Sequence, residues 1–138
     1  MIGNIISQNI GVTMPITTTI SHDRALTIHT VTGDPPFDEL MATLKQFWES
    51  QPTRNLLWDF SEARLAHISY SEARKIIDYV RPQTEKRAGG KTALVGSKDI
   101  EYGMSRTLKA LREFQNPSYQ LEVFRSMEEA SQWLDEED

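Results

Sequence analysis

The stretch Gly89-Gly90-Lys91-Thr92 holds residue types that bind phosphate in many nucleotide-binding proteins, where Gly-Lys-Thr ends a glycine-rich loop. Such a loop also has a glycine five positions before its last glycine, and Glu85 stands at that position. The stretch precedes an apolar run, whereas a phosphate-binding loop follows a strand. We therefore predict a glycine turn between a helix and a strand here, and no nucleotide site.

Histidines and serines could supply a general base or a nucleophile. The histidines His22, His29 and His67 lack the spacings typical of zinc sites. The sequence around Ser105 lacks the second glycine of a nucleophile elbow. His67 follows a predicted central strand and is kept as a candidate, although a solvent-facing loop histidine is the commoner case. We expect no catalytic residue, no metal and no cofactor, and an enzyme of unrecognised type ranks third among the functions considered.

Basic residues outnumber acidic ones between Glu62 and Lys91, by seven to four. Pairs spaced i,i+4 on a helix, such as Arg74 with Asp78, account for part of this excess. The rest predicts a docking surface for an anionic group or an acidic partner as the alternative to a solvated helix face.

Hydrophobic periodicity predicts the elements that position these residues. Alternation over residues 16–30 predicts a β-hairpin. Apolar residues from Phe37 to Trp48 have helical spacing, and Asp34 is the expected N-cap of that helix. The near-continuous apolar run Asn55–Phe60 is typical of a strand covered on both faces.

The second half of the chain continues the alternation. Ser69 and Glu72 form a capping box before a helix that ends near Val80, and Ser126 begins a terminal helix in the same way. Strands are predicted over residues 92–95 and 119–125. Between them a helix begins at Ser97 or Asp99, and its expected buried face consists of Ile100, Met104, Leu108 and Leu111.

This order, ββαβαβαβα, predicts one α/β domain with a mixed, mostly parallel five-stranded sheet and about four helices. Functional groups in such sheets usually lie beyond the carboxyl ends of the parallel strands. The chain has 138 residues, a net charge of −5 and no cysteine. We therefore expect a cytoplasmic protein that does not bind nucleic acid and does not insert into a membrane.

The segment Leu56-Leu57-Trp58-Asp59-Phe60-Ser61 is a buried strand that ends in Asp, an apolar residue and Ser, with serines at a helix start soon after. It resembles the STAS domain, the fold of bacterial anti-sigma-factor antagonists, and in particular a SpoIIAA-like group of small bacterial proteins. Further similarity lies in residues 27–33, 89–95 and 123–125.

This resemblance implies a non-enzymatic regulatory or protein-interaction module, modulated by phosphorylation of a serine at a helix start. A phosphate adds about two negative charges, and free N–H groups at a helix N-terminus can hold it. The antagonists carry an Asp-Ser-Ser-Gly-like turn where this chain has His67-Ile68-Ser69-Tyr70. The regulatory or interaction candidates are therefore Asp59, Ser61, His67, Ser69 and Ser71.

An alternative function is binding of a small hydrophobic or anionic ligand, as in SEC14-like sheets, with Arg87, Lys91 and Tyr102 as candidate pocket residues. The partner is thus a protein or a small molecule, and a homodimer is also considered. The domain is predicted to span residues 14–134. Residues 1–13 are expected to be an N-terminal extension, either disordered or an extra strand, and residues 135–138 an acidic tail.

Overall fold

The computed structural model describes residues 15–113 and 118–136. The predicted N-terminal extension therefore lies outside the described residues. Of the predicted acidic tail, only Asp135 and Glu136 are described. Asp135 is the last residue of a helix and accepts two hydrogen bonds from Arg24, at 2.8 and 3.1 Å, so it is part of the folded domain.

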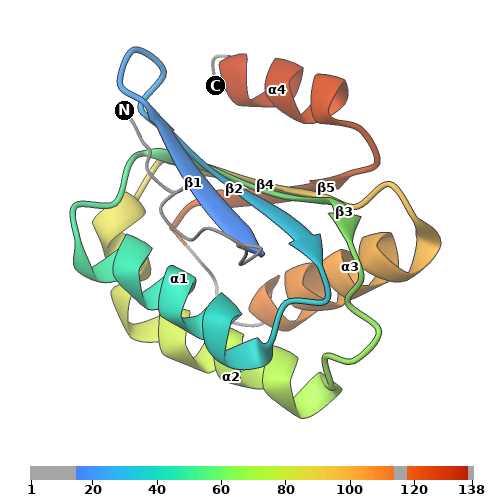
Figure 1. The fold of residues 1–138 in the computed structure, drawn as a ribbon. Coiled ribbons are helices and arrows are strands. Elements are labelled where there is room, and N and C mark those ends of the chain that lie inside the picture. The colour runs from blue at the N-terminus through green and yellow to red at the C-terminus, as the bar shows by residue number, and fades with distance from the viewer. Residues whose placement is uncertain (1–14, 114–117, 137–138) are drawn as a thin grey trace, which may run out of the picture.

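The core of the fold is a five-stranded sheet in which the strands lie in chain order (Figure 1). The first pair is antiparallel and the other three pairs are parallel. The strands are β1 (Ile16–Ser21), β2 (Leu26–Gly33), β3 (Asn55–Ala63), β4 (Lys91–Val95) and β5 (Gln120–Phe124). This mixed sheet with four α-helices confirms the predicted fold class.

Three helices cover one face of the sheet, and the fourth covers the other (Figure 1). The α-helices are α1 (Phe37–Glu49), α2 (Tyr70–Val80), α3 (Asp99–Glu113) and α4 (Met127–Asp135), and a 3₁₀ helix, η2 (Arg81–Arg87), continues α2. Crossovers between parallel strands are right-handed, which places α1, α2 and α3 on the same face when the strands follow in order. Within the described residues, no helix is both long and apolar enough to cross a bilayer.

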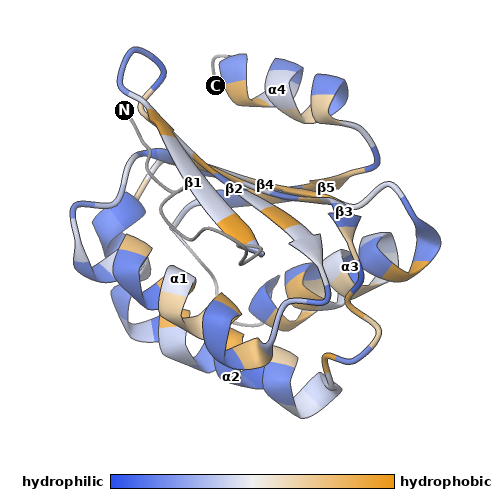
Figure 2. Ribbon diagram, viewed as in Figure 1, coloured by the Kyte–Doolittle hydropathy of each residue, from blue (hydrophilic) through white to orange (hydrophobic). Residues whose placement is uncertain are grey.

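The two faces of the sheet have separate apolar clusters. The larger cluster lies between the sheet and α1–α3 and includes Trp48, Trp58 and Phe60. The smaller one lies under α4 and includes Leu57 and Val95. Figure 2 shows apolar residues on the sheet and on the inward sides of the helices, with hydrophilic residues outside. Strand alternation explains the division, because Trp58 and Leu57 point to opposite faces of β3.

The N-cap predicted for the first helix is wrong. Pro36 occupies that position, and Asp34 instead accepts two hydrogen bonds of 2.8 Å from Nε and Nη2 of Arg64. Arg64 follows β3 directly, and its backbone N–H donates to the carbonyl of Gly33 at 2.7 Å. The pairing of β2 with β3 thus brings the two side chains together, which no local sequence pattern reveals.

The buried face predicted for α3 is also partly wrong, because Ile100 is 59% exposed. The residues of α3 that are buried each lie one position later than predicted face residues: Glu101, Ser105 and Arg112. A carboxylate oxygen of Glu101 accepts a hydrogen bond of 2.8 Å from the N–H of Leu65, which holds the helix in this rotation. The polar contact of Glu101 at the start of α3 therefore helps to set its orientation.

Candidate functional site

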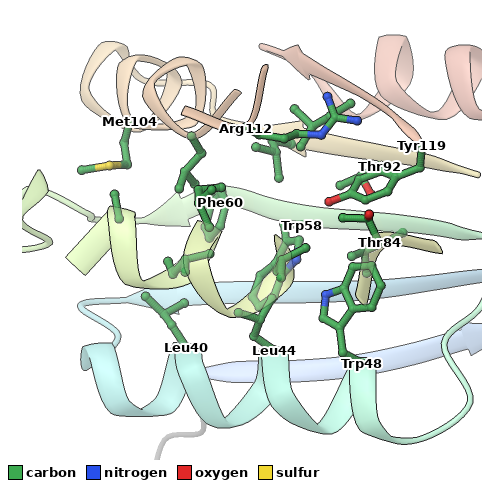
Figure 3. A pocket seen from close by; sticks show the side chains of 18 of the residues that line it. Leu40, Leu44, Trp48, Trp58, Phe60, Thr84, Thr92, Met104, Arg112 and Tyr119 are labelled. Carbon is green, nitrogen blue, oxygen red and sulfur yellow. The ribbon is translucent and has the colours of Figure 1, made fainter. Parts of the chain in front are cut away.

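A cavity of about 100 Å³ lies between the sheet and helices α1–α3 (Figure 3). Native cores contain few voids larger than a water molecule, so a cavity of this size stands out. Its lining comes from β3, β4, β5, the three helices and η2: Leu40, Leu44, Trp48, Leu56, Trp58, Phe60, Leu65, Ile68, Ala73, Ile76, Ile77, Val80, Thr84, Arg87, Thr92, Leu94, Met104, Leu108, Arg112, Tyr119 and Leu121.

Most of the lining is apolar because an apolar face of α1 lies opposite an apolar face of β3. Leu40, Leu44 and Trp48 are spaced by four residues and share one face of α1. On β3, Trp58 and Phe60 are spaced by two residues, and their rings stack with centroids 5.8 Å apart. Figure 3 shows these side chains pointing toward one another across the cavity. Such walls favour an apolar ligand or an apolar part of one.

Arg87 is a charged residue in this lining and is only 3% exposed. Its guanidinium donates to the carbonyls of Thr53 (3.0 Å), Arg54 (2.8 Å) and Lys91 (2.9 Å) and to the hydroxyl of Thr92 (2.7 Å). These carbonyls lie just before or at the start of β3 and β4. Arg87 therefore ties η2 to the amino-terminal ends of two parallel strands.

Aromatic rings surround the same guanidinium. Cζ of Arg87 lies 4.8 Å from the ring centroid of Tyr119, 5.4 Å from that of Phe47 and 5.5 Å from that of Trp48. Burial lowers the pKa of Arg87 to about 10; the contact with Tyr119 opposes this shift and the positive charge of Arg112 adds to it. Arg87 is therefore a cation at neutral pH.

Arg112 is the second guanidinium in the lining, and its Cζ lies 4.6 Å from the same Tyr119 ring. The residue is 5% exposed, and among the described residues neither Nε nor Nη2 has a hydrogen-bond partner. Nη1 lies 3.6 Å from a carboxylate oxygen of Glu113, a side chain that is 57% exposed. A buried donor without a partner costs about 1–3 kcal/mol, so this arrangement needs a reason.

The polar end of the cavity lies at the amino-terminal ends of the parallel strands. Thr92 is the second residue of β4, and Tyr119 directly precedes β5. Figure 3 shows Thr84, Thr92 and Tyr119 together at one end of the cavity, with Leu40 and Met104 at the other. The polar end of the cavity is thus opposite to the carboxyl ends of the parallel strands, where functional groups were expected.

The structure does not bring the three predicted pocket residues together. Arg87 lines the cavity, but Lys91 points to the opposite face and donates to the carbonyls of Trp133 and Glu136 at the end of α4. Tyr102 lies in the first half of α3, where its ring is 4.2 Å from Cζ of Arg125. The charges of the basic segment are likewise dispersed, since Arg81 pairs with Asp78 at 2.8 Å on the surface.

Asp59 and Ser61 lie within β3, which extends three residues beyond the predicted end of the strand at Phe60. A carboxylate oxygen of Asp59 accepts a hydrogen bond of 2.9 Å from the N–H of Ser61. The carbonyl of Ser61 accepts one of 3.3 Å from the hydroxyl of Ser97. Both residues therefore help to shape the carboxyl edge of the sheet.

The other regulatory candidates surround the start of α2. Ser69 is its N-cap: Oγ accepts from the N–H of Glu72 at 3.1 Å, and the Glu72 carboxylate accepts from the N–H of Ser69 at 3.0 Å. The predicted capping box is thus confirmed. Ser71 Oγ lies 3.2 Å from Ser69 Oγ, and Nε2 of His67 donates to the carbonyl of Pro35 at 2.6 Å. These side chains are exposed and do not line the cavity.

The sequence analysis did not single out Arg112 as a candidate, although it lines the cavity. One signal was present: Met104, Leu108 and Arg112 follow one another at a spacing of four, and all three line the cavity. Comparison with known proteins adds no identification: neither the family models nor the curated proteins include a match to this chain. Among the described residues, no group of three or more His, Asp or Glu side chains is placed to hold a metal ion.

Proposed function

We propose that this protein is a binding module for a small, largely apolar molecule that occupies the cavity between the sheet and helices α1–α3. The observation that carries the proposal is the cavity itself, with about 100 Å³ of space behind walls that are mainly aromatic and aliphatic. Ligand sites are typically concave and apolar, with a few placed polar groups, and this lining has that composition. This is the small-ligand alternative considered from the sequence, now located in a cavity whose polar end is at the amino-terminal side of the parallel strands.

A titration with a neutral apolar probe tests this proposal. We expect 1-hexanol to shift the NMR signals of the indole N–H groups of Trp48 and Trp58, which both line the cavity. Leu108→Phe should fill the space and abolish the shifts. Leu111→Phe is the matched control, because it makes the same change in the same helix at a residue outside the lining. Equal shifts in both variants would show that the probe binds elsewhere.

A second candidate function is the regulatory or protein-interaction module of STAS type, with the surface from His67 to Ser71 as the contact region. The specific observation in its favour is Tyr70, a large side chain that is 59% exposed at the start of α2, between the exposed Ser69 and Ser71. Exposed aromatic residues are common at the centres of protein interfaces.

Peptide mass spectrometry on protein from its native host tests the switched form of this candidate. A phosphoserine between Ser61 and Ser71 under some growth condition is the expected result. Its absence under all conditions would remove phosphorylation from the proposal. An interaction surface without a switch would then be tested by Tyr70→Ala against a purified partner.

A further inference from the structure

The two cavity guanidiniums differ in one respect that points to a ligand. Arg87 uses its N–H groups on protein acceptors, namely three carbonyls and one hydroxyl. Arg112 is equally buried, yet its Nε and Nη2 have no acceptor within the described part of the chain. A folded protein rarely leaves two donors of one buried side chain unpaired. The missing acceptors are supplied naturally by a bound molecule.

The geometry of the unpaired atoms specifies the acceptor. Nε and Nη2 form one side of the guanidinium, with two parallel N–H groups that match the two oxygens of a carboxylate. The same protein shows this match on its surface, where Nε and Nη2 of Arg64 hold the two oxygens of Asp34 at 2.8 Å each. Arg112 presents the same pair of donors inside the core.

The charge around the cavity favours an anion. Its lining includes two guanidiniums and, among the described residues, no carboxylate. Glu101 is the buried acid of the described chain, and its carboxylate accepts from the N–H of Leu65. A buried cation is costly unless a counter-charge accompanies it. A monoanion would compensate charge here, whereas a phosphate dianion would bring more oxygens and more charge into a largely apolar space.

The size of the cavity limits the rest of the ligand. An engineered cavity of about 150 Å³ holds benzene, so about 100 Å³ accommodates an apolar tail of roughly four to five carbon atoms. The walls beyond the polar end are aliphatic and aromatic, as at Leu40, Phe60 and Met104. The ligand is therefore a short molecule with a charged head and an apolar tail.

We infer that the cavity binds a short-chain monocarboxylate, with the carboxylate on Nε and Nη2 of Arg112 and an apolar tail of about four to five carbons between α1, α2 and β3. This inference rests on the proposed function and specifies its ligand class. Arg87 contributes positive potential as a second cation in contact with the Tyr119 ring, while its own hydrogen bonds remain with the protein. Arg112 is the residue that recognises the head group.

Calorimetric titrations of the wild type and of Arg112→Met with hexanoate, 1-hexanol and hexyl phosphate test the inference. A second variant, Arg112→Lys, keeps the positive charge but loses the paired N–H donors. Hydrogen bonds to a charged group predict that the wild type binds hexanoate roughly 10- to 100-fold more tightly than 1-hexanol. Arg112→Met should lose this preference and still bind the alcohol. Arg112→Lys should retain part of it. Arg106→Met, at an exposed residue of the same helix, is the control and should behave as the wild type.

The alternative results are distinct. Equal binding of hexanoate and 1-hexanol by the wild type would overturn the carboxylate assignment and leave the proposed function standing. Tighter binding of hexyl phosphate than of hexanoate would also overturn it, in favour of a phosphate head group. Failure of the wild type to bind any of the three would refute the proposed function and the inference together.

Discussion

Replacing the two cavity arginines by methionine, one at a time, is expected to change the stability of the ligand-free protein in opposite directions. Arg112→Met removes two buried N–H donors that have no acceptor among the described residues. Each such donor costs about 1–3 kcal/mol, and the lost contact with the Tyr119 ring offsets about 0.5–2 kcal/mol of the gain. We therefore expect Arg112→Met to increase the free energy of unfolding by about 1–3 kcal/mol.

Arg87→Met should have the opposite effect. It leaves the carbonyls of Thr53, Arg54 and Lys91 without this donor in a buried region, and it removes three cation–π contacts. Part of the cost is returned because a buried charge is also removed, so we expect a net loss of about 2–5 kcal/mol. The two substitutions are chemically identical, and both occur beside Tyr119. The difference in sign therefore reports mainly on hydrogen-bond pairing, with a smaller part from the two additional ring contacts of Arg87.

Urea unfolding of dialysed protein, followed by far-ultraviolet circular dichroism, measures both free energies. For a domain of this length, each kcal/mol corresponds to roughly 3–4 °C in Tm, so thermal melts provide an independent check. A loss of more than about 2 kcal/mol in Arg112→Met, on the scale of breaking a satisfied buried interaction, would refute the reasoning. It would show that the protein itself satisfies Nε and Nη2 of Arg112. The ligand inference would then lose its main support.

Three further predictions concern other parts of the fold. Burial lowers the pKa of His29 from 6.5 to about 4, so between these pH values the unfolded chain binds a proton that the folded chain does not. The free energy of unfolding should therefore fall by about 2–3 kcal/mol between neutral pH and pH 4.5. Urea unfolding of His29→Gln should show a smaller fall. Gly90→Ala should destabilise the fold by about 1–3 kcal/mol or more, because a Cβ there would overlap the backbone oxygen of Arg54. Gly103→Ala, on the open side of α3, should stabilise it by up to about 1 kcal/mol. Equal effects of the two substitutions in thermal melts would contradict the close backbone approach at Gly90. Ser69→Ala should cost about 1 kcal/mol through loss of the N-cap and Ser71→Ala much less, and a similar loss in both variants would mean that the cap contributes little.

The order of elements was predictable because its signals are local. Apolar spacing in α1, the buried run in β3, the capping box at Ser69 and the N-cap at Ser126 each depend on a few neighbouring residues. The rules for crossovers then leave few arrangements for the sheet. The same reasoning failed at Asp34, because its partner Arg64 lies 30 residues away and reaches it only through strand pairing.

The site was harder to predict because charged side chains line a buried cavity, whereas charged residues usually lie on the surface. Arginine is usually exposed, so the apolar pattern that predicted a buried face with Ile100 gave no reason to consider Arg112. Glu101 and Arg112 are the buried residues instead, in contact with Leu65 and with the Tyr119 ring respectively. Lys91 illustrates the other limit, since the one-residue alternation of β4 sends it to the face of α4 while Thr92 faces the cavity.

The division of the sheet into two faces also separates the tryptophans. Trp48 and Trp58 line the cavity, whereas Trp133 lies on α4, with its ring 5.5 Å from that of Phe124 on the other side of the sheet. The chain has three tryptophans, so Trp133→Phe leaves indole emission that originates only from the cavity wall. Trp48 lies close to the Arg87 cation, and Trp58 stacks on Phe60, which gives the two fluorophores different surroundings. The fold therefore contains its own optical reporter of cavity occupancy, which requires no attached label.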